Sequence, residues 1–93
     1  MTPATRPALD NAFVAPRGAL ETRLAGLWEE VLATAPIGAD DDFFDLGGAS
    51  LQAFAIIARV HRDLGVVLTP RDLFTCATVA AMAALIADRS PAR

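Results

Sequence analysis

The sequence predicts an all-α fold, a small four-helix bundle with three main helices and a short third helix. Apolar residues recur at helical spacing in three segments, and glycine or proline marks the ends of segments. No segment shows a strand pattern of comparable strength, since the apolar run 66–68 is too short to be more than a connection. With 93 residues, 54% of them hydrophobic and 20% charged, the chain has the size and composition of one folded domain.

The first helix is predicted over residues 19–33. Its apolar residues fall on one face, namely Leu20, Leu24, Leu27, Trp28 and Val31. Glu21 lies in the first turn, where the helix dipole favours an acid. Glu29 and Glu30 lie off the apolar face, so we expect them to be solvated, whereas we expect Trp28 in the core.

A long loop over residues 34–49 follows the first helix and contains the acidic run 40–42. A calcium loop would need a glutamate at its twelfth position, and none of the three possible registers supplies one, so we expect no metal. We expect instead a solvated turn in which an aspartate caps a short helical turn over 43–46. Phe43 and Phe44 should anchor this loop to the core, because a loop of this length needs apolar anchors in a small domain.

The second helix is predicted to begin at Ser50 or Leu51 and to end near residue 63, stopped by Gly65. Its inward face consists of Ala53, Ile56, Ile57, Val60 and Leu64. Phe54 lies one turn after Ser50 and off that face, and Leu51 borders the same side. Exposed apolar residues of this kind often mark partner sites, although the first helix or the loop could also cover Phe54.

A short third helix begins after Thr69, with Thr69 as the cap, Pro70 at the first position and an acid in the first turn. Leu73 and Phe74 are predicted to point its apolar side inward. The last helix is predicted over residues 79–88. Its buried face consists of Val79, Met82, Ala83 and Ile86.

The start of the second helix is the candidate functional site. Gly47 and Gly48 free the backbone there, and Ser50 stands where an N-cap residue would stand. The hydroxyl would be exposed on a rigid element, beside unpaired N–H groups that favour an anion. This geometry suits a serine that is to carry a phosphate ester. The alternative is a serine that only caps the helix.

The turn and the serine form one continuous motif, Phe43-Phe44-Asp45-Leu46-Gly47-Gly48-Ala49-Ser50-Leu51. This motif resembles the phosphopantetheine attachment motif of peptidyl carrier proteins, the thiolation domains of nonribosomal peptide synthetases. The resemblance covers roughly residues 13–87 and implies an acyl carrier protein-like fold.

The resemblance also suggests how the chain is divided. Residues 13–17 resemble the linker that joins an adenylation domain to the carrier domain after it. We therefore expect a flexible N-terminal linker over residues 1–17, a carrier domain over 18–89 and a short C-terminal tail over 90–93.

The resemblance implies that Ser50 carries 4′-phosphopantetheine as a covalent cofactor, moved from coenzyme A by a phosphopantetheinyl transferase. An adenylation domain would load an amino acid as a thioester, and condensation, thioesterase or tailoring enzymes would receive it. Acids such as Asp45 would steer the approach of partners. The residues expected to contact partners are Ala49, Leu51, Phe54, Arg71 and Asp72.

One residue departs from the family pattern. Peptidyl carriers commonly have His or Asp just before the serine, where this chain has Ala49. The backbone role is undisturbed, but a side-chain contact to some partners would be missing, so neither the downstream domain nor the cargo is indicated. One alternative is an acyl or aryl carrier of polyketide or siderophore assembly, with the same modification. The other is an unmodified helical interaction domain.

The residues do not predict an enzyme. A serine hydrolase would need Gly-x-Ser-x-Gly after a strand, and here Gln52 takes the place of the last glycine. The only histidine, His61, would lie about 16 Å along the helix from Ser50, beyond hydrogen-bond reach. Cys76 is the only cysteine and can form neither an internal disulfide nor a zinc site.

The net charge and the hydropathy of the sequence argue against some classes of partner. The formal net charge of −3 argues against nucleic acid and favours basic protein surfaces. No stretch reaches the ~20 apolar residues of a membrane span, and the N-terminus has no signal-peptide pattern. We therefore expect a cytoplasmic monomer.

Overall fold

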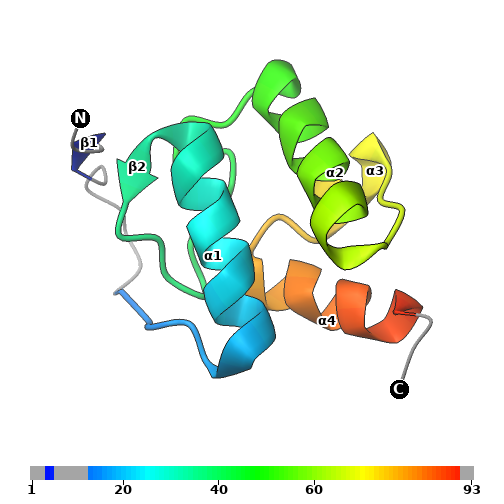
Figure 1. Ribbon diagram of the computed structural model, residues 1–93. Coiled ribbons are helices and arrows are strands. Elements are labelled where there is room, and N and C mark those ends of the chain that lie inside the picture. The colour runs from blue at the N-terminus through cyan, green and yellow to red at the C-terminus, as the bar shows by residue number, and fades with distance from the viewer. Residues whose placement is uncertain (1–3, 6–12, 91–93) are drawn as a thin grey trace.

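Four helices make up most of the described chain, which is residues 4–5 and 13–90 of a computed structural model (Figure 1). They are α1 (Gly18–Leu32), α2 (Ser50–Leu64), α3 (Pro70–Thr75) and α4 (Val79–Arg89). Helix α1 packs against both α2 and α4, and α3 packs against α2. The prediction of an all-α bundle with a short third helix is confirmed.

The structure also contains a short strand pairing that the sequence did not predict. Strand β1 (Ala4–Thr5) pairs in parallel with β2 (Thr34–Ala35). Strands of two residues are too short to produce a periodic pattern, so nothing in the sequence could indicate them. Most of the predicted linker, and residues 91–93 of the predicted tail, lie outside the described residues.

Helix α1 presents its predicted apolar face to the core, with Leu24, Leu27 and Trp28 buried. The expectation that Glu29 is solvated was wrong. Its carboxylate accepts a hydrogen bond from the backbone N–H of Ile37 at 3.0 Å, because the chain folds back over the helix after α1 ends. The neighbouring Glu30 is exposed, as expected.

Two aspartates of the acidic run 40–42, in the loop after β2, bind the loop backbone and are not simply solvated. Asp41 is fully buried and accepts a hydrogen bond from the Gly38 N–H at 2.8 Å, which corrects the prediction of a solvated turn. Asp42 caps the following turn as predicted, since its Oδ1 accepts from the N–H groups of Phe44 (2.8 Å) and Asp45 (3.1 Å). Both carboxylates therefore stabilise the backbone that leads to α2.

Backbone hydrogen bonds hold this loop from two sides. The Ala39 N–H donates to the Val14 carbonyl at 2.7 Å, and the Ala39 carbonyl accepts from the Ala80 N–H at 2.9 Å. Further along, the Phe43 N–H donates to the Ala77 carbonyl at 2.7 Å. The loop thus lies between the lead-in to α1 and the start of α4, and little of its backbone is free to move.

Phe43 joins the loop to the core. Its side chain is fully buried and meets Trp28 edge to face, with ring centroids 5.6 Å apart. Gly48 lies directly against this ring, and its N–H donates to the Phe43 carbonyl at 3.0 Å. A Cβ at Gly48 would lie 2.6 Å from Cδ2 of Phe43 and closer still to two other ring atoms. The motif therefore needs glycine at this position because the ring occupies the space of a side chain.

The remaining caps and faces follow the prediction closely. Gly65 ends α2 in the left-handed conformation, with φ of 71°. Thr69 caps α3 through a hydrogen bond from the Asp72 N–H. On α2, Ile56 and Val60 are buried. On α4 the buried residues are the four predicted ones, Val79, Met82, Ala83 and Ile86.

Two glycine-to-alanine substitutions should have opposite effects on stability. Gly48→Ala should lower the free energy of unfolding by about 1–3 kcal/mol, because the new methyl group overlaps the buried Phe43 ring. Gly26→Ala, in the middle of α1 where nothing lies within 4 Å of an added Cβ, should raise it by about 0.5–1 kcal/mol. Urea denaturation followed by circular dichroism measures both, and equal effects would contradict the packing described for Gly48.

Candidate functional site

Ser50 is the first residue of α2, and its side chain is exposed. The sequence placed it at the N-cap, but the structure gives that position to Ala49, whose backbone is extended with φ of −138° and ψ of 178°. Ser50 therefore does not cap the helix. Its hydroxyl has no hydrogen-bond partner among the described residues, so the oxygen is available to another molecule.

The partial positive charge at the N-terminus of α2 is not neutralised by an acidic side chain of the first turn. Ala49 has no side-chain acceptor, and the first turn holds no acidic residue. Gln52 supplies half of a capping box, because its Oε1 accepts a hydrogen bond from the Ala49 N–H at 3.2 Å. The N–H groups that follow lack a side-chain cap, so this helix end favours an anion on or near Ser50.

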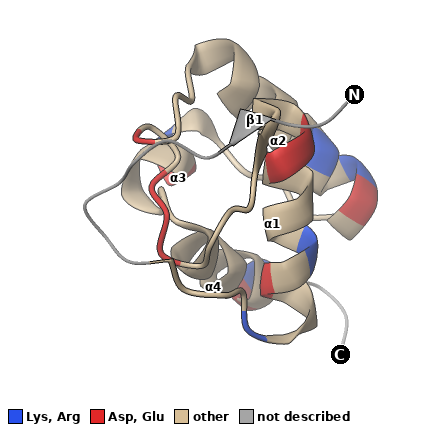
Figure 2. Cartoon of the chain, turned by 90° about the vertical axis from the view of Figure 1, so that its left-hand side faces the viewer, with Lys and Arg blue, Asp and Glu red and all other residues tan. Residues whose placement is uncertain are grey.

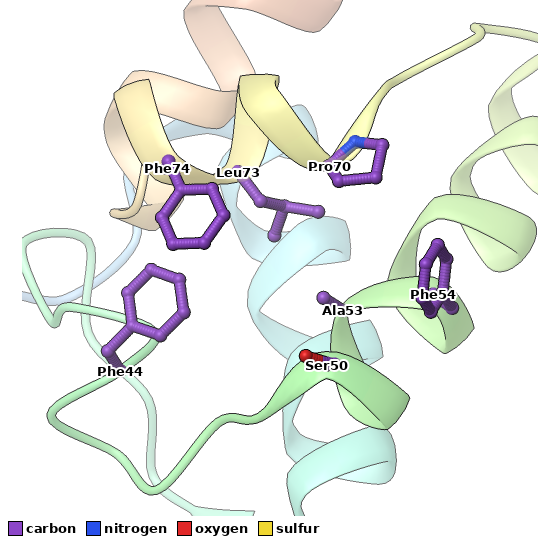
Figure 3. Close-up of a pocket in the computed structure, with 7 residues that line it drawn as sticks. All are labelled: Phe44, Ser50, Ala53, Phe54, Pro70, Leu73 and Phe74. Carbon is purple, nitrogen blue, oxygen red and sulfur yellow. The ribbon is translucent and has the colours of Figure 1, made fainter.

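An apolar cleft opens beside Ser50, between α2 and α3 (Figure 3). It has a volume of about 340 Å³, open solvent included. Helix α2 contributes Ser50, Ala53 and Phe54, helix α3 contributes Pro70, Leu73 and Phe74, and the preceding loop contributes Phe44. The hydroxyl of Ser50 is thus a polar group at the edge of a mostly apolar recess.

Two phenylalanines at this cleft are more exposed than the sequence predicted. Phe74 was expected to point inward but is 72% exposed, because Leu73 alone enters the core from the short helix α3. Phe44 was expected to anchor the loop, yet only Phe43 is buried, and Phe44 is 38% exposed. The rings of Phe44 and Phe74 stack on each other, with centroids 5.2 Å apart and planes 16° apart. An aromatic pair from two segments distant in sequence has no local signature, so the sequence could not reveal it.

The two apolar residues predicted to contact partners are both exposed. Leu51 is 81% exposed and Phe54 is 58% exposed, so neither the loop nor α1 covers Phe54. They face different recesses, however. Phe54 lines the cleft beside Ser50, whereas Leu51 lines a shallower recess against α1 that includes Val31 and Ala55. Ser50 therefore stands next to apolar surface on two sides.

The two charged candidates on α3 differ in what they contact. Arg71 is exposed, whereas both carboxylate oxygens of Asp72 are occupied. Asp72 accepts hydrogen bonds from the guanidinium of Arg89 at 2.6 and 3.1 Å and from the Thr69 N–H at 2.8 Å. The Arg89 guanidinium, followed by the Thr69 N–H, lowers the pKa of Asp72 to about 2. Asp72 therefore stabilises α3, and Arg71 is the α3 charge that a partner can reach.

The charges near the site are unevenly distributed. Acidic residues lie along the loop that leads to α2, whereas the opposite side of this view carries arginines together with further acidic residues on α1 and α2 (Figure 2). Within residues 4–5 and 13–90, no group of His, Cys, Asp or Glu could hold a metal ion. No helix of the described chain is long and apolar enough to cross a membrane. His61 is exposed on α2.

The chain matches a known family over most of its length. Residues 22–86 match the family described as phosphopantetheine attachment site. Tyrocidine synthase 3 of Brevibacillus parabrevis is 42% identical over 85 residues, which is 91% of this chain and 1% of the synthase. The chain therefore corresponds to a very small part of that relative.

Two solved structures are similar to this chain over nearly all of their own length. An active-site mutant of a peptidyl carrier protein has a TM-score of 0.85 and 41% identity, with 94% of this chain and 97% of that chain covered. A peptidyl carrier protein solved with the phosphopantetheine transferase Sfp and coenzyme A has a TM-score of 0.81 and 44% identity. That alignment covers 83% of this chain and all of the other.

The lowered pKa of Asp72 has a consequence for stability in acid. A carboxyl group whose pKa falls on folding stabilises the fold above its unfolded pKa of about 3.9. That contribution is lost as the pH falls through about 2. Asp72→Asn can still accept from the Thr69 N–H but cannot form the ion pair. The difference in melting temperature between wild type and Asp72→Asn should therefore shrink between pH 5 and pH 2, and a constant difference would contradict the assignment.

Proposed function

Since the chain belongs to the phosphopantetheine attachment-site family, and within it to the peptidyl carrier proteins, we propose that Ser50 is the residue that carries 4′-phosphopantetheine. The observation that carries this proposal is an exposed serine hydroxyl at the uncapped N-terminus of α2. Peptidyl carriers hold cargo and do not catalyse, which confirms the expectation of a carrier rather than an enzyme.

The residues around Ser50 fit the cofactor that the family uses. A phosphodiester on the Ser50 oxygen would lie at the positive end of α2, where neither an acid nor a capping side chain competes for the N–H groups. The exposure of Ser50 leaves room for a transferase to approach. When bound, the cofactor supplies a terminal thiol on a long flexible arm, which raises the local concentration of cargo in a partner's site.

The chain must rely on another protein for the chemistry at Ser50. His61, the only histidine, lies near the other end of the same helix and is exposed. We infer that a phosphopantetheinyl transferase supplies the general base and the metal. A related carrier has been solved in complex with such an enzyme and coenzyme A. The chain itself contributes the oxygen and holds it in place.

We further propose that the chain holds an aminoacyl or peptidyl group during nonribosomal peptide synthesis. Its similarity to tyrocidine synthase 3 and to peptidyl carriers supports this cargo over the acyl or aryl cargo of polyketide or siderophore assembly. An adenylation domain would load the group. Condensation, thioesterase or tailoring enzymes would then receive it.

The surface around Ser50 is suited to brief contacts with such enzymes. Leu51 and Phe54 present exposed apolar surface on either side of the serine, and Arg71 adds an exposed positive charge. Ala49 is also exposed, although its methyl group offers little specificity. Acids of the preceding loop, such as Asp45, would steer basic partners toward this surface (Figure 2).

Intact-protein mass spectrometry tests the attachment site. After incubation with coenzyme A, magnesium and a broad-specificity phosphopantetheinyl transferase, the wild type should gain one phosphopantetheine group and Ser50→Ala should gain none. Because Ser50 makes no capping hydrogen bond, Ser50→Ala should cost less than the ~0.5–2 kcal/mol typical of a lost cap, as a thermal melt would show. Modification of Ser50→Ala, or no modification of the folded wild type, would disprove the assignment.

A second substitution tests the apolar contact surface. Phe54→Ala should slow modification by the transferase while changing the free energy of unfolding by no more than about 1 kcal/mol, because the ring is largely exposed. Val67→Ala is the matched control, since Val67 is 66% exposed and does not line the cleft beside Ser50. A large fall in melting temperature for Phe54→Ala, or equal rates for both variants, would show that Phe54 is not a contact residue.

A further inference from the structure

One arginine joins the end of α4 to the beginning of α3. Arg89 Nη1 donates to Asp72 Oδ2 at 2.6 Å, and Arg89 Nη2 donates to Asp72 Oδ1 at 3.1 Å. Nη1 also donates to the Val67 carbonyl at 3.2 Å, on the connection that precedes α3. A guanidinium that meets a carboxylate through two parallel hydrogen bonds fixes both direction and distance, which a lysine cannot do.

This contact differs from the other ion pairs between side chains of the described helices. Arg59 with Glu30 joins α2 to α1, and Arg62 with Asp63 stays within α2, so neither reaches α3. The two side chains that join α4 to α3 are 39% and 15% exposed. Solvent therefore screens this pair less than a pair on the open surface.

Helix α3 needs support from outside itself. It has six residues, fewer than a helix needs to be stable alone in water. Leu73 is its one buried residue, and its neighbour Phe74 is largely exposed. The contacts that set the position of α3 therefore include the burial of Leu73 and the ion pair with Arg89 of α4.

The position of α3 also shapes the site. Pro70, Leu73 and Phe74 form one wall of the cleft, opposite Ser50 on α2 (Figure 3). A shift of α3 would widen or close this cleft and would separate the stacked rings of Phe74 and Phe44. Contacts that hold α3 therefore control the surface that an approaching enzyme meets beside Ser50.

We propose that Arg89 is a positioning residue, which sets α3 against α2 and so shapes the cleft that partner enzymes recognise beside Ser50. Its contacts are Asp72 and Val67, and neither lines the cleft, so Arg89 acts through the backbone of α3. The inference rests on the proposed function, because it concerns how partner enzymes recognise the surface around a modified serine.

Steady-state kinetics of phosphopantetheine transfer test this role, with the apo carrier as the varied substrate. Arg89→Ala should raise KM for the carrier about fivefold and leave kcat unchanged, since Ser50 itself is undisturbed. Arg89→Lys should recover part of the loss. Arg62→Ala, which also breaks an exposed ion pair, is the matched control and should leave KM unchanged. All variants are compared well below their melting temperatures, so that unfolding does not contribute.

A spectroscopic measurement follows α3 directly. In two-dimensional proton–carbon spectra, Arg89→Ala should shift the methyl signals of Leu73 on α3 and leave those of Ile56 on α2 in place. Asp72→Asn should shift the Leu73 methyl signals in the same way. The double variant should shift them no further than Arg89→Ala alone, because Arg89→Ala already removes the ion pair that Asp72→Asn breaks.

The possible results separate this inference from the proposed function. If the wild type is modified at Ser50 but Arg89→Ala has the wild-type KM, or the Leu73 methyl signals stay in place, the role of Arg89 is disproved and the carrier function stands. If the wild type is not modified at all, the proposed function fails and the recognition role of Arg89 fails with it. The Leu73 signals then still decide whether Arg89 positions α3.

Discussion

Burial of the Phe43 ring is the constraint on which the site depends. The ring meets Trp28 in the core and leaves no room for a side chain at Gly48, while the Phe43 N–H donates to the Ala77 carbonyl just before α4. Asp42 caps the turn that follows. The chain between Phe43 and α2 is therefore fixed at its beginning and short enough that the start of α2 is fixed as well. An exposed serine is held in one place because an aromatic ring nearby is buried.

Most of the fold could be predicted because it depends on local chemistry. The helical spacing of apolar residues identified the buried faces of α2 and α4, and Gly65, Thr69 and Pro70 act within one turn of their positions. The attachment motif was also visible, since its glycines, its apolar residues and its serine are contiguous. These features can be recognised in the sequence without knowing which residues of other helices they contact.

The rest of the site depends on contacts between distant segments. Phe74 stacks on Phe44, thirty residues earlier in the chain, and no local pattern encodes that pairing. Asp41 is buried because the loop folds tightly enough for Gly38 to donate to it. The helix begins at Ser50, one of its two predicted starts, so the N-cap is Ala49 and not Ser50, a difference of one residue that is usual for helix boundaries. The cleft between α2 and α3 arises only when these contacts form together.

The residue that departs from the family pattern changes the charge and the hydrogen bonding at the start of α2. An aspartate at position 49 would place a negative charge at the N-cap, where its oxygen could accept hydrogen bonds from the first N–H groups of α2. A phosphodiester on Ser50 would need the same N–H groups and would be repelled by that charge. Ala49 offers neither an acceptor nor a charge, so the helix end stays positive, and the Gln52 side chain bonds there only to the Ala49 N–H. The site thus gives up one possible side-chain contact with partners, and no acid at its N-cap offsets the positive end of the helix dipole.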